Sequence, residues 1–151
     1  MTNYTDVISL ERAKLYLKVD AGQTETDDEI ISMINSSLSF IEKRTNHIFK
    51  TRDKVYYQDC ALVQSVKVYD YPINTINSAI VNRPLYSIVP TVNSFVTLNI
   101  GYTTLAAIPN ELIDAALQLI KVWFYESEKQ VNSTLIPLSV MEAIDVNRRF
   151  I

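Results

Sequence analysis

Glycine, histidine and cysteine are scarce in this sequence of 151 residues. It holds two glycines, Gly22 and Gly101, one histidine, His47, and one cysteine, Cys60. The distant glycines exclude a glycine-rich phosphate-binding loop, and the single histidine and cysteine exclude the usual zinc ligand sets. A lone cysteine forms no internal disulfide and suits a reducing compartment. We therefore predict a protein that is not an enzyme and that needs no cofactor or metal.

The sequence also has no excess of positively charged residues. Lys and Arg total 14 against 17 Asp and Glu, which gives a formal net charge of -3. Binding to nucleic-acid phosphates usually needs clustered Lys and Arg, so sequence-specific DNA binding is disfavoured. One rival stays open, a small regulatory or nucleic-acid-binding domain with a basic face made of Lys14, Lys18, Lys43 and Arg44.

The chain lacks the apolar runs that secretion and membrane insertion require. Met1 to Leu10 contain Asp6 and polar residues where a signal peptide has a positive start and an apolar stretch. The most apolar segment is interrupted by Asp114, Gln118 and Lys121, whereas a membrane span needs nearly 20 apolar positions. We expect a protein made in the cytoplasm that has no membrane partner.

Apolar residues do recur at helical spacing in the first third of the chain. Ser9 stands where an N-cap would, after Ile8, and predicts a helix over about 9–19. The segment Thr26-Asp27-Asp28-Glu29 has the pattern of a capping box and predicts a second helix over about 26–45. Its acidic residues suit the positive end of the helix dipole better than a metal or acid-base site. We expect His47, just after this helix, to be exposed or to cap the helix end.

Between residues 49 and 101 the pattern changes to short stretches rich in β-branched residues and tyrosine. Prolines and asparagines cut these stretches into short antiparallel strands. Val96, Leu98 and Ile100 alternate with polar residues and predict a last strand that ends at Gly101. The role of the segment from Pro84 to Pro90 stays open.

Pro109 suits the first turn of a third helix, over about 109–129. Its apolar residues cover roughly 220° of a helical wheel, about twice a one-sided stripe. The helix must be covered on more than one side, either by its own domain or by a neighbouring subunit. If a neighbour covers it, the candidate interface residues are Leu112, Leu119, Trp123 and Phe124. Tyr86 joins them because tyrosine is favoured at interfaces, although it is also an ordinary strand former.

The predicted fold class is α+β, with a helical core of about three to four helices and an inserted antiparallel β region. A domain of 1–135 is followed by a short apolar tail, 136–151, which is too short to be stable alone. Either its own domain or a partner must dock this tail. Arg148 and Arg149 at its end suit the phosphates of DNA or the carboxylates of a partner.

The order of these signals resembles the head-to-tail connector, or head-completion, family of tailed bacteriophages. The resemblance spans essentially the whole chain and is clearest in the second half. The residues that carry it are Ile8-Ser9-Leu10-Glu11-Arg12-Ala13-Lys14, Tyr71-Pro72-Ile73-Asn74-Thr75-Ile76, Gly101-Tyr102, Ile108-Pro109, Ala115-Ala116, Trp123-Phe124-Tyr125-Glu126 and Ile136-Pro137.

This resemblance implies an adaptor protein of the virion neck, made in the host cytoplasm. It would form a ring, commonly twelvefold, beneath the portal protein and extend the channel through which DNA passes without specific binding. The C-terminal segment would reach the portal, through Pro137, Leu138, Met141, Ile144, Arg148, Arg149 and Phe150. Another neck or tail-completion protein is the alternative.

Overall fold

The computed structural model describes residues 3–57, 66–76, 79–80, 87–88, 95–128 and 136–148. The chain divides into two compact units. The helical unit comprises Met1–Thr45 and Ile108–Arg148, and the β unit comprises Asn46–Ala107. A β unit is thus inserted between two helical segments, which confirms the predicted α+β class. The structure groups residues 136–148 of the predicted tail with the helical unit, and the role of the tail as a separate docking segment stays a prediction.

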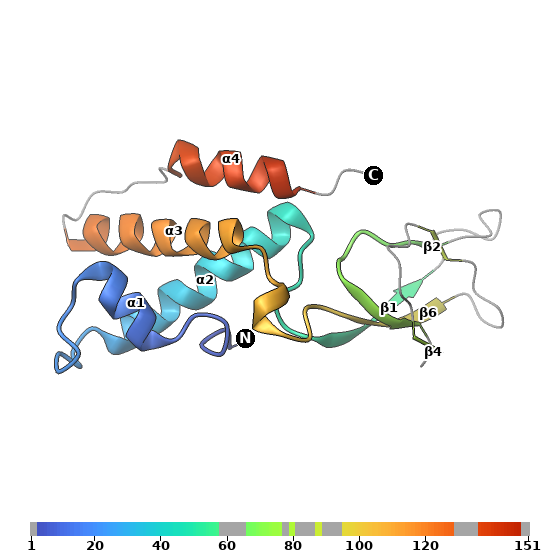
Figure 1. Cartoon of the computed structure of the whole chain (residues 1–151), viewed down its shortest axis with the longest axis horizontal. Coiled ribbons are helices and arrows are strands. Elements are labelled where there is room, and N and C mark those ends of the chain that lie inside the picture. The colour runs from blue at the N-terminus through green and yellow to red at the C-terminus, as the bar shows by residue number, and fades with distance from the viewer. Residues whose placement is uncertain are drawn as a thin grey trace. The chain divides into compact units, whose positions relative to one another are not determined.

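The helical unit holds four helices among the described residues. These are α1 (Leu10–Leu17), α2 (Asp27–Thr45), α3 (Asn110–Glu128) and α4 (Leu138–Asn147). Figure 1 shows α3 between α4 on one side and α1 and α2 on the other, and α3 packs against all three. The wide apolar surface of α3 is therefore covered by its own unit, the first of the two predicted alternatives.

Local capping explains where α1 begins and ends. The Ser9 hydroxyl accepts a hydrogen bond from the Arg12 N–H at 3.2 Å, as an N-cap does, and Ile8 is fully buried beside it. The helix ends at Lys18, whose φ of 60° lies in the left-handed region. The N-cap predicted at Ser9 is confirmed.

The capping box predicted at the start of α2 is not formed. Within the described residues, the Thr26 hydroxyl oxygen is buried and makes no hydrogen bond. Instead the Lys14 amine forms an ion pair with Asp27 and donates a hydrogen bond to the Gln23 carbonyl at 2.6 Å. Lys14 is only 5% exposed, so it holds the turn between α1 and α2 and cannot belong to an exposed basic face.

The β unit contains a four-stranded antiparallel sheet in the order β1-β6-β3-β4. Its strands are β1 (Arg52–Tyr57), β3 (Ile73–Ile76), β4 (Ala79–Ile80) and β6 (Phe95–Ile100), and β2 (Val66–Lys67) pairs separately with β5 (Ser87–Ile88). The 3-10 turn η1 (Leu105–Ala107) follows β6. Strands within 49–101 were predicted, and the described residues confirm them.

One face of this sheet forms the core of the β unit. Val96, Leu98 and Ile100 alternate along β6 and are fully buried, as their spacing predicted. They pack with Ile48, Val68 and Ile73. On the opposite face of β1 and β6, Val55, Tyr57 and Phe95 are exposed, whereas Thr97 and Asn99 are half-buried.

The expectation that His47 is exposed or caps α2 is wrong. Asn46, with a φ of 60°, takes the left-handed position at the end of α2. His47 is 7% exposed, and its Nδ1 lies 2.6 Å from the Tyr102 hydroxyl. The Ile48 N–H donates to the Tyr71 carbonyl at 2.7 Å, and this pairing draws His47 into the β unit.

Candidate interaction surface

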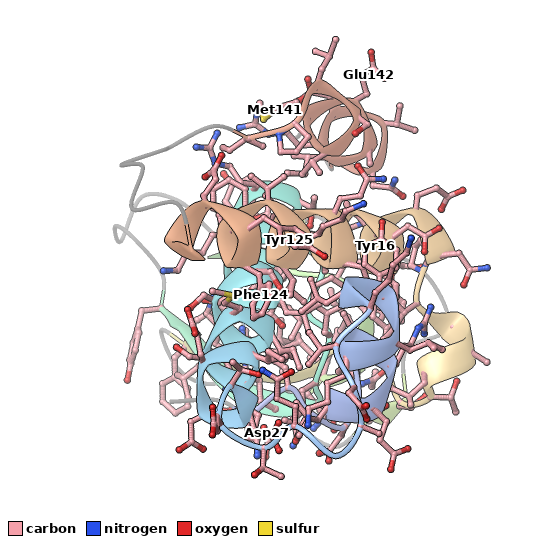
Figure 2. The ribbon with its side chains drawn as sticks, turned by 90° about the vertical axis from the view of Figure 1, so that its left-hand side faces the viewer. Tyr16, Asp27, Phe124, Tyr125, Met141 and Glu142 are labelled. Atoms are coloured by element: carbon pink, nitrogen blue, oxygen red, sulfur yellow. The ribbon has the colours of Figure 1, made fainter. Side chains whose placement is uncertain are left out.

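Three of the residues predicted at a subunit interface lie in the core of the helical unit. Leu112 and Leu119 are 0% exposed and Phe124 is 5% exposed. Figure 2 labels Phe124 on α3. These three side chains are covered within their own unit and offer almost no surface to a neighbouring subunit, and their place at an interface stays a prediction. Trp123 stays half-buried, and Tyr86 lies outside the described residues.

The tail helix α4 docks on its own unit through one face. Val140 and Ile144 are buried, and α4 packs against α3 and α2. Ile144 is thus removed from the candidate portal contacts. Leu138 and Val146 point away from this packing and are 74% and 84% exposed. Pro137, Met141 and Arg148 keep exposed area, whereas Arg149 and Phe150 lie outside the described residues.

A hollow of about 410 Å³ opens beside α1, α3 and Pro137. The Tyr125 hydroxyl donates a hydrogen bond to the Leu17 carbonyl at 2.8 Å and so ties α3 to α1. Figure 2 shows Tyr16 and Tyr125 on these two helices. Glu126 also lines the hollow, and its Oε2 is buried without a hydrogen bond among the described residues.

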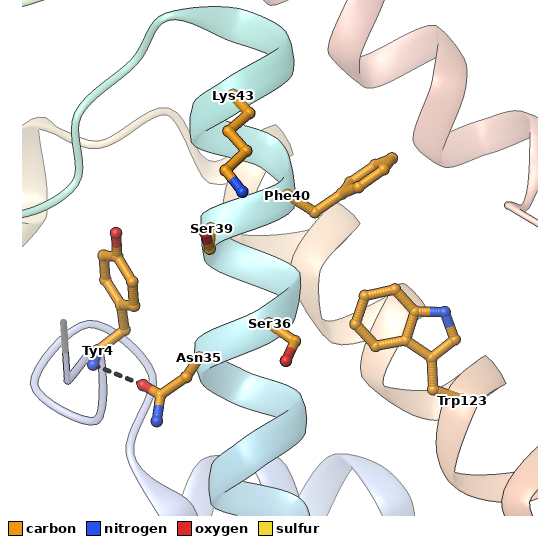
Figure 3. Close-up of a pocket in the computed structure, with 7 residues that line it drawn as sticks. All are labelled: Tyr4, Asn35, Ser36, Ser39, Phe40, Lys43 and Trp123. Carbon is orange, nitrogen blue, oxygen red and sulfur yellow. Dashed lines mark hydrogen bonds between the residues drawn. The ribbon is translucent and has the colours of Figure 1, made fainter. Parts of the chain in front are cut away.

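A second hollow of about 410 Å³, the α2/α3 hollow, lies on a different side of α3 (Figure 3). It is lined by Tyr4, Asn35, Ser36, Ser39, Phe40, Lys43 and Trp123. Phe40 and Trp123 are both half-buried, and the Arg44 guanidinium lies 5.1 Å from the centre of the Phe40 ring. The lining therefore combines apolar aromatic walls with serine hydroxyls and a cationic rim.

The N-terminal segment fixes one wall of the α2/α3 hollow. The Tyr4 N–H donates to Asn35 Oδ1 at 2.8 Å, as drawn in Figure 3. The Tyr4 hydroxyl donates to Glu42 Oε2 at 2.7 Å, and Glu42 is only 6% exposed. The Glu42 carboxylate is thus buried and engaged, whereas the next two residues, Lys43 and Arg44, are exposed.

The outer face of the sheet carries a third apolar surface. Tyr57 and Phe95 lie opposite each other across β1 and β6, with ring centres 6.1 Å apart. Tyr57 is 70% exposed, and Val55, two residues earlier on the same strand face, is 42% exposed. Exposed tyrosine and valine on a sheet face are typical of a contact surface, although they also suit an ordinary strand.

Polar side chains on and beside β1 bind one another. The Tyr56 hydroxyl donates to Asp70, which also pairs with Lys54 at 2.6 Å. Burial raises the pKa of Tyr56, and the hydrogen bond to Asp70 and its negative charge raise it further. The phenol therefore stays protonated as a donor.

Among the described residues, no group of three or more His, Cys, Asp or Glu side chains lies close enough together to bind a metal ion. No helix in the described part of the chain is long and apolar enough to span a membrane.

Sequence reasoning missed the α2/α3 hollow and the outer sheet face. One signal for the hollow was present, because Phe40 stands on the otherwise polar side of α2 near Ser36, Ser39 and Lys43. No comparable signal marked Trp123 as the residue that faces it, since a helical wheel places Trp123 among the buried positions of α3.

No protein-family model matches this chain, and no curated protein matches it in sequence. Solved structures match its fold along nearly its whole length. A chain in a structure described as the virion of a native gene transfer agent particle has 13% identity and a TM-score of 0.70, with 99% of this chain and 93% of that chain covered. Two further structures have the same coverage and 15% identity. They are described as the neck of an empty particle computed with C6 symmetry, with a TM-score of 0.69, and the neck of a native particle computed with C12 symmetry, with a TM-score of 0.67. At these identities the likeness shows a shared fold.

Proposed function

We propose that this protein is a structural component of the neck of a phage-like virion, at the junction of head and tail. The observation that carries the proposal is the shared fold with chains of a gene transfer agent virion and its neck, over 99% of this chain. Because the match covers the helical unit and the inserted β unit together, it is not a likeness of one common motif. The order of sequence signals, which resembles phage head-to-tail connectors, supports the same assignment.

Within the neck, we propose that the protein is an adaptor that forms a ring beneath the portal and extends the DNA channel. Two similar neck structures were computed with C6 and C12 symmetry, which supports a ring of about twelve copies. A ring requires two different contact surfaces on each subunit. The α2/α3 hollow and the exposed apolar residues on other helices could supply them.

The portal contact is assigned to the exposed side of the C-terminal segment. Pro137, Leu138, Met141 and Arg148 keep exposed area there, and Val146 adds a large apolar side chain. Arg149 and Phe150 follow in sequence and belong to the same proposed contact. Apolar side chains at 74% and 84% exposure gain most from burial against a partner.

The proposed role involves no catalysis, and DNA only passes through the channel. The burial of Lys14 weakens the rival nucleic-acid-binding function, because it removes one of the four residues of the supposed basic face. The net charge of -3 also disfavours strong retention of phosphates.

A pull-down with the portal of the same particle tests this proposal. We expect the full-length chain to retain the portal, and the double variant Leu138→Ser/Val146→Ser to bind it about tenfold more weakly, since two apolar contacts are lost. Glu142→Ser, at an exposed position of the same helix, is the matched control and should bind normally.

Two other results of this pull-down would lead to different conclusions. Retention of a different neck or tail protein in place of the portal would assign another neck position. Retention of DNA at physiological salt, without any virion protein, would contradict the proposal.

A further inference from the structure

The end of α1, the turn after it and the start of α2 carry an exposed apolar side chain and four exposed carboxylates within a short stretch of sequence. Leu15 is 81% exposed, although its neighbours Ala13 and Leu17 are buried. Asp20, Glu25, Asp28 and Glu29 follow within 14 residues and are all exposed, against one exposed lysine, Lys18. We call Leu15 together with these four acidic residues the acidic turn. It is an apolar anchor flanked by negative charge.

The α2/α3 hollow has the complementary character. Figure 3 shows the aromatic rings of Phe40 and Trp123 on one side of α2 together with Ser36, whereas Ser39 lies on the side of α2 toward Tyr4. Lys43 and Arg44 are exposed at its rim, whereas the neighbouring Glu42 is buried and accepts a hydrogen bond from Tyr4. The hollow therefore suits an apolar side chain that carries acidic neighbours.

The end of α1, which carries Leu15, and the hollow lie on different sides of α3. Tyr125 reaches the carbonyl of Leu17 in α1, whereas Trp123 faces the hollow beside α2. Two residues along a helix correspond to a rotation of about 200°. A single subunit therefore does not bring its own Leu15 to its own hollow. A contact between the two is head-to-tail, the kind of contact that closes into a ring.

We infer that Leu15 and the acidic turn of one copy dock on the α2/α3 hollow of the next copy. This inference rests on the proposed ring and specifies its contact surface. Charge complementarity between the four carboxylates and the rim formed by Lys43 and Arg44 identifies the occupant as a second copy of this chain. Burial of the Leu15 side chain in the hollow supplies the apolar contact. The opposite charges of the carboxylates and of Lys43 and Arg44 make the contact specific for these two surfaces.

A charge swap tests this contact, with self-association of the full-length chain measured by sedimentation, alone and together with the portal. Lys43→Glu should weaken association about tenfold or more, because it places like charges together. The double variant Glu25→Lys/Asp28→Lys should weaken it to a similar extent. Combining all three substitutions should restore association to within about threefold of the unmodified chain.

Two controls separate the contact from general effects of charge or folding. Lys54→Glu combined with Glu25→Lys/Asp28→Lys should not restore association, because Lys54 lies on β1, outside both surfaces of the proposed contact. Leu15→Ser should weaken association, whereas Leu105→Ser, at an exposed leucine in η1 that belongs to neither proposed contact, should leave self-association unchanged. Thermal unfolding of each variant shows whether it is folded.

Rings that form unchanged when Lys43 and the acidic turn are reversed would overturn this inference and leave the proposed neck function standing. Loss of portal binding, with self-association intact, would also overturn it, because the hollow would then seat the portal. A chain that associates with neither itself nor the portal would contradict both.

Discussion

Gly101 shows how one residue fixes the exit from the sheet. Its φ of +110° lies where residues with a Cβ are strained. A Cβ at this position would lie 2.7 Å from the Lys50 carbonyl oxygen, closer than real Cβ contacts allow. The chain can turn from β6 toward α3 here only because the residue has no side chain.

We predict that Gly101→Ala lowers the free energy of unfolding by about 2 kcal/mol or more, from backbone strain and the clash with Lys50. Gly22→Ala is the matched control, since a Cβ there would meet its nearest neighbour, Asp20 Oδ1, at 3.7 Å. The control should change stability by less than about 0.5 kcal/mol. Urea unfolding of the full-length chain measures both, and equal stability of the two variants would contradict the account of Gly101.

Single-residue roles were predictable where the cause is local. The Ser9 cap depends on its own helix, so the sequence pattern predicted it. The roles of Lys14 and His47 depend on partners far along the chain, Asp27 for the first and Tyr102 for the second. Nothing in the sequence near Lys14 or His47 shows that either side chain is buried.

At the scale of elements, periodicity predicted the helices well. The three long predictions, 9–19, 26–45 and 109–129, agree with α1, α2 and α3 to within two residues at each end. The width of the apolar arc on α3 predicted that more than one neighbour covers it, and the structure shows that α1, α2 and α4 are those neighbours. The width of this arc could not show whether α3 is covered by helices of the same subunit or by another subunit, since both would bury the same side chains.

For the C-terminal tail as well, the sequence could not tell docking on its own domain from docking on a partner. Its apolar residues predicted that something must dock it, but a segment of 16 residues contains no signal that names its partner. In the structure, the apolar residues of α4 form a buried group and an exposed group. Val140 and Ile144 face α3, and Leu138 and Val146 face outward. Deletion of the whole segment would thus uncover α3 as well as remove a surface, so point substitutions are the better test of function.

We predict that Ile144→Ala lowers the free energy of unfolding by about 2–4 kcal/mol, because it leaves a cavity between α4 and its neighbours. Val146→Ala on the same helix should change it by less than about 0.5 kcal/mol, since that side chain is 84% exposed. Thermal or chemical unfolding of the two variants gives this comparison. If both variants were as stable as the unmodified chain, α4 would not be docked through Ile144.

At the scale of the whole molecule, the fold, the net charge and the exposed surfaces all fit a subunit of a larger assembly. The fold is shared with chains of a virion and its neck, and the net charge is mildly negative. The helical unit exposes apolar residues on α1 and α4 and has a hollow lined partly by aromatic rings beside α2. A subunit held between two neighbours and a portal would use all of these surfaces, whereas an isolated monomer would leave them in contact with water.

Electron microscopy of the full-length chain mixed with the portal of its own particle tests the central claim most directly. The account predicts a ring of about twelve copies, coaxial with the portal, with an open channel through both. Portal particles that look the same with and without the chain, together with a chain that remains monomeric, would contradict it.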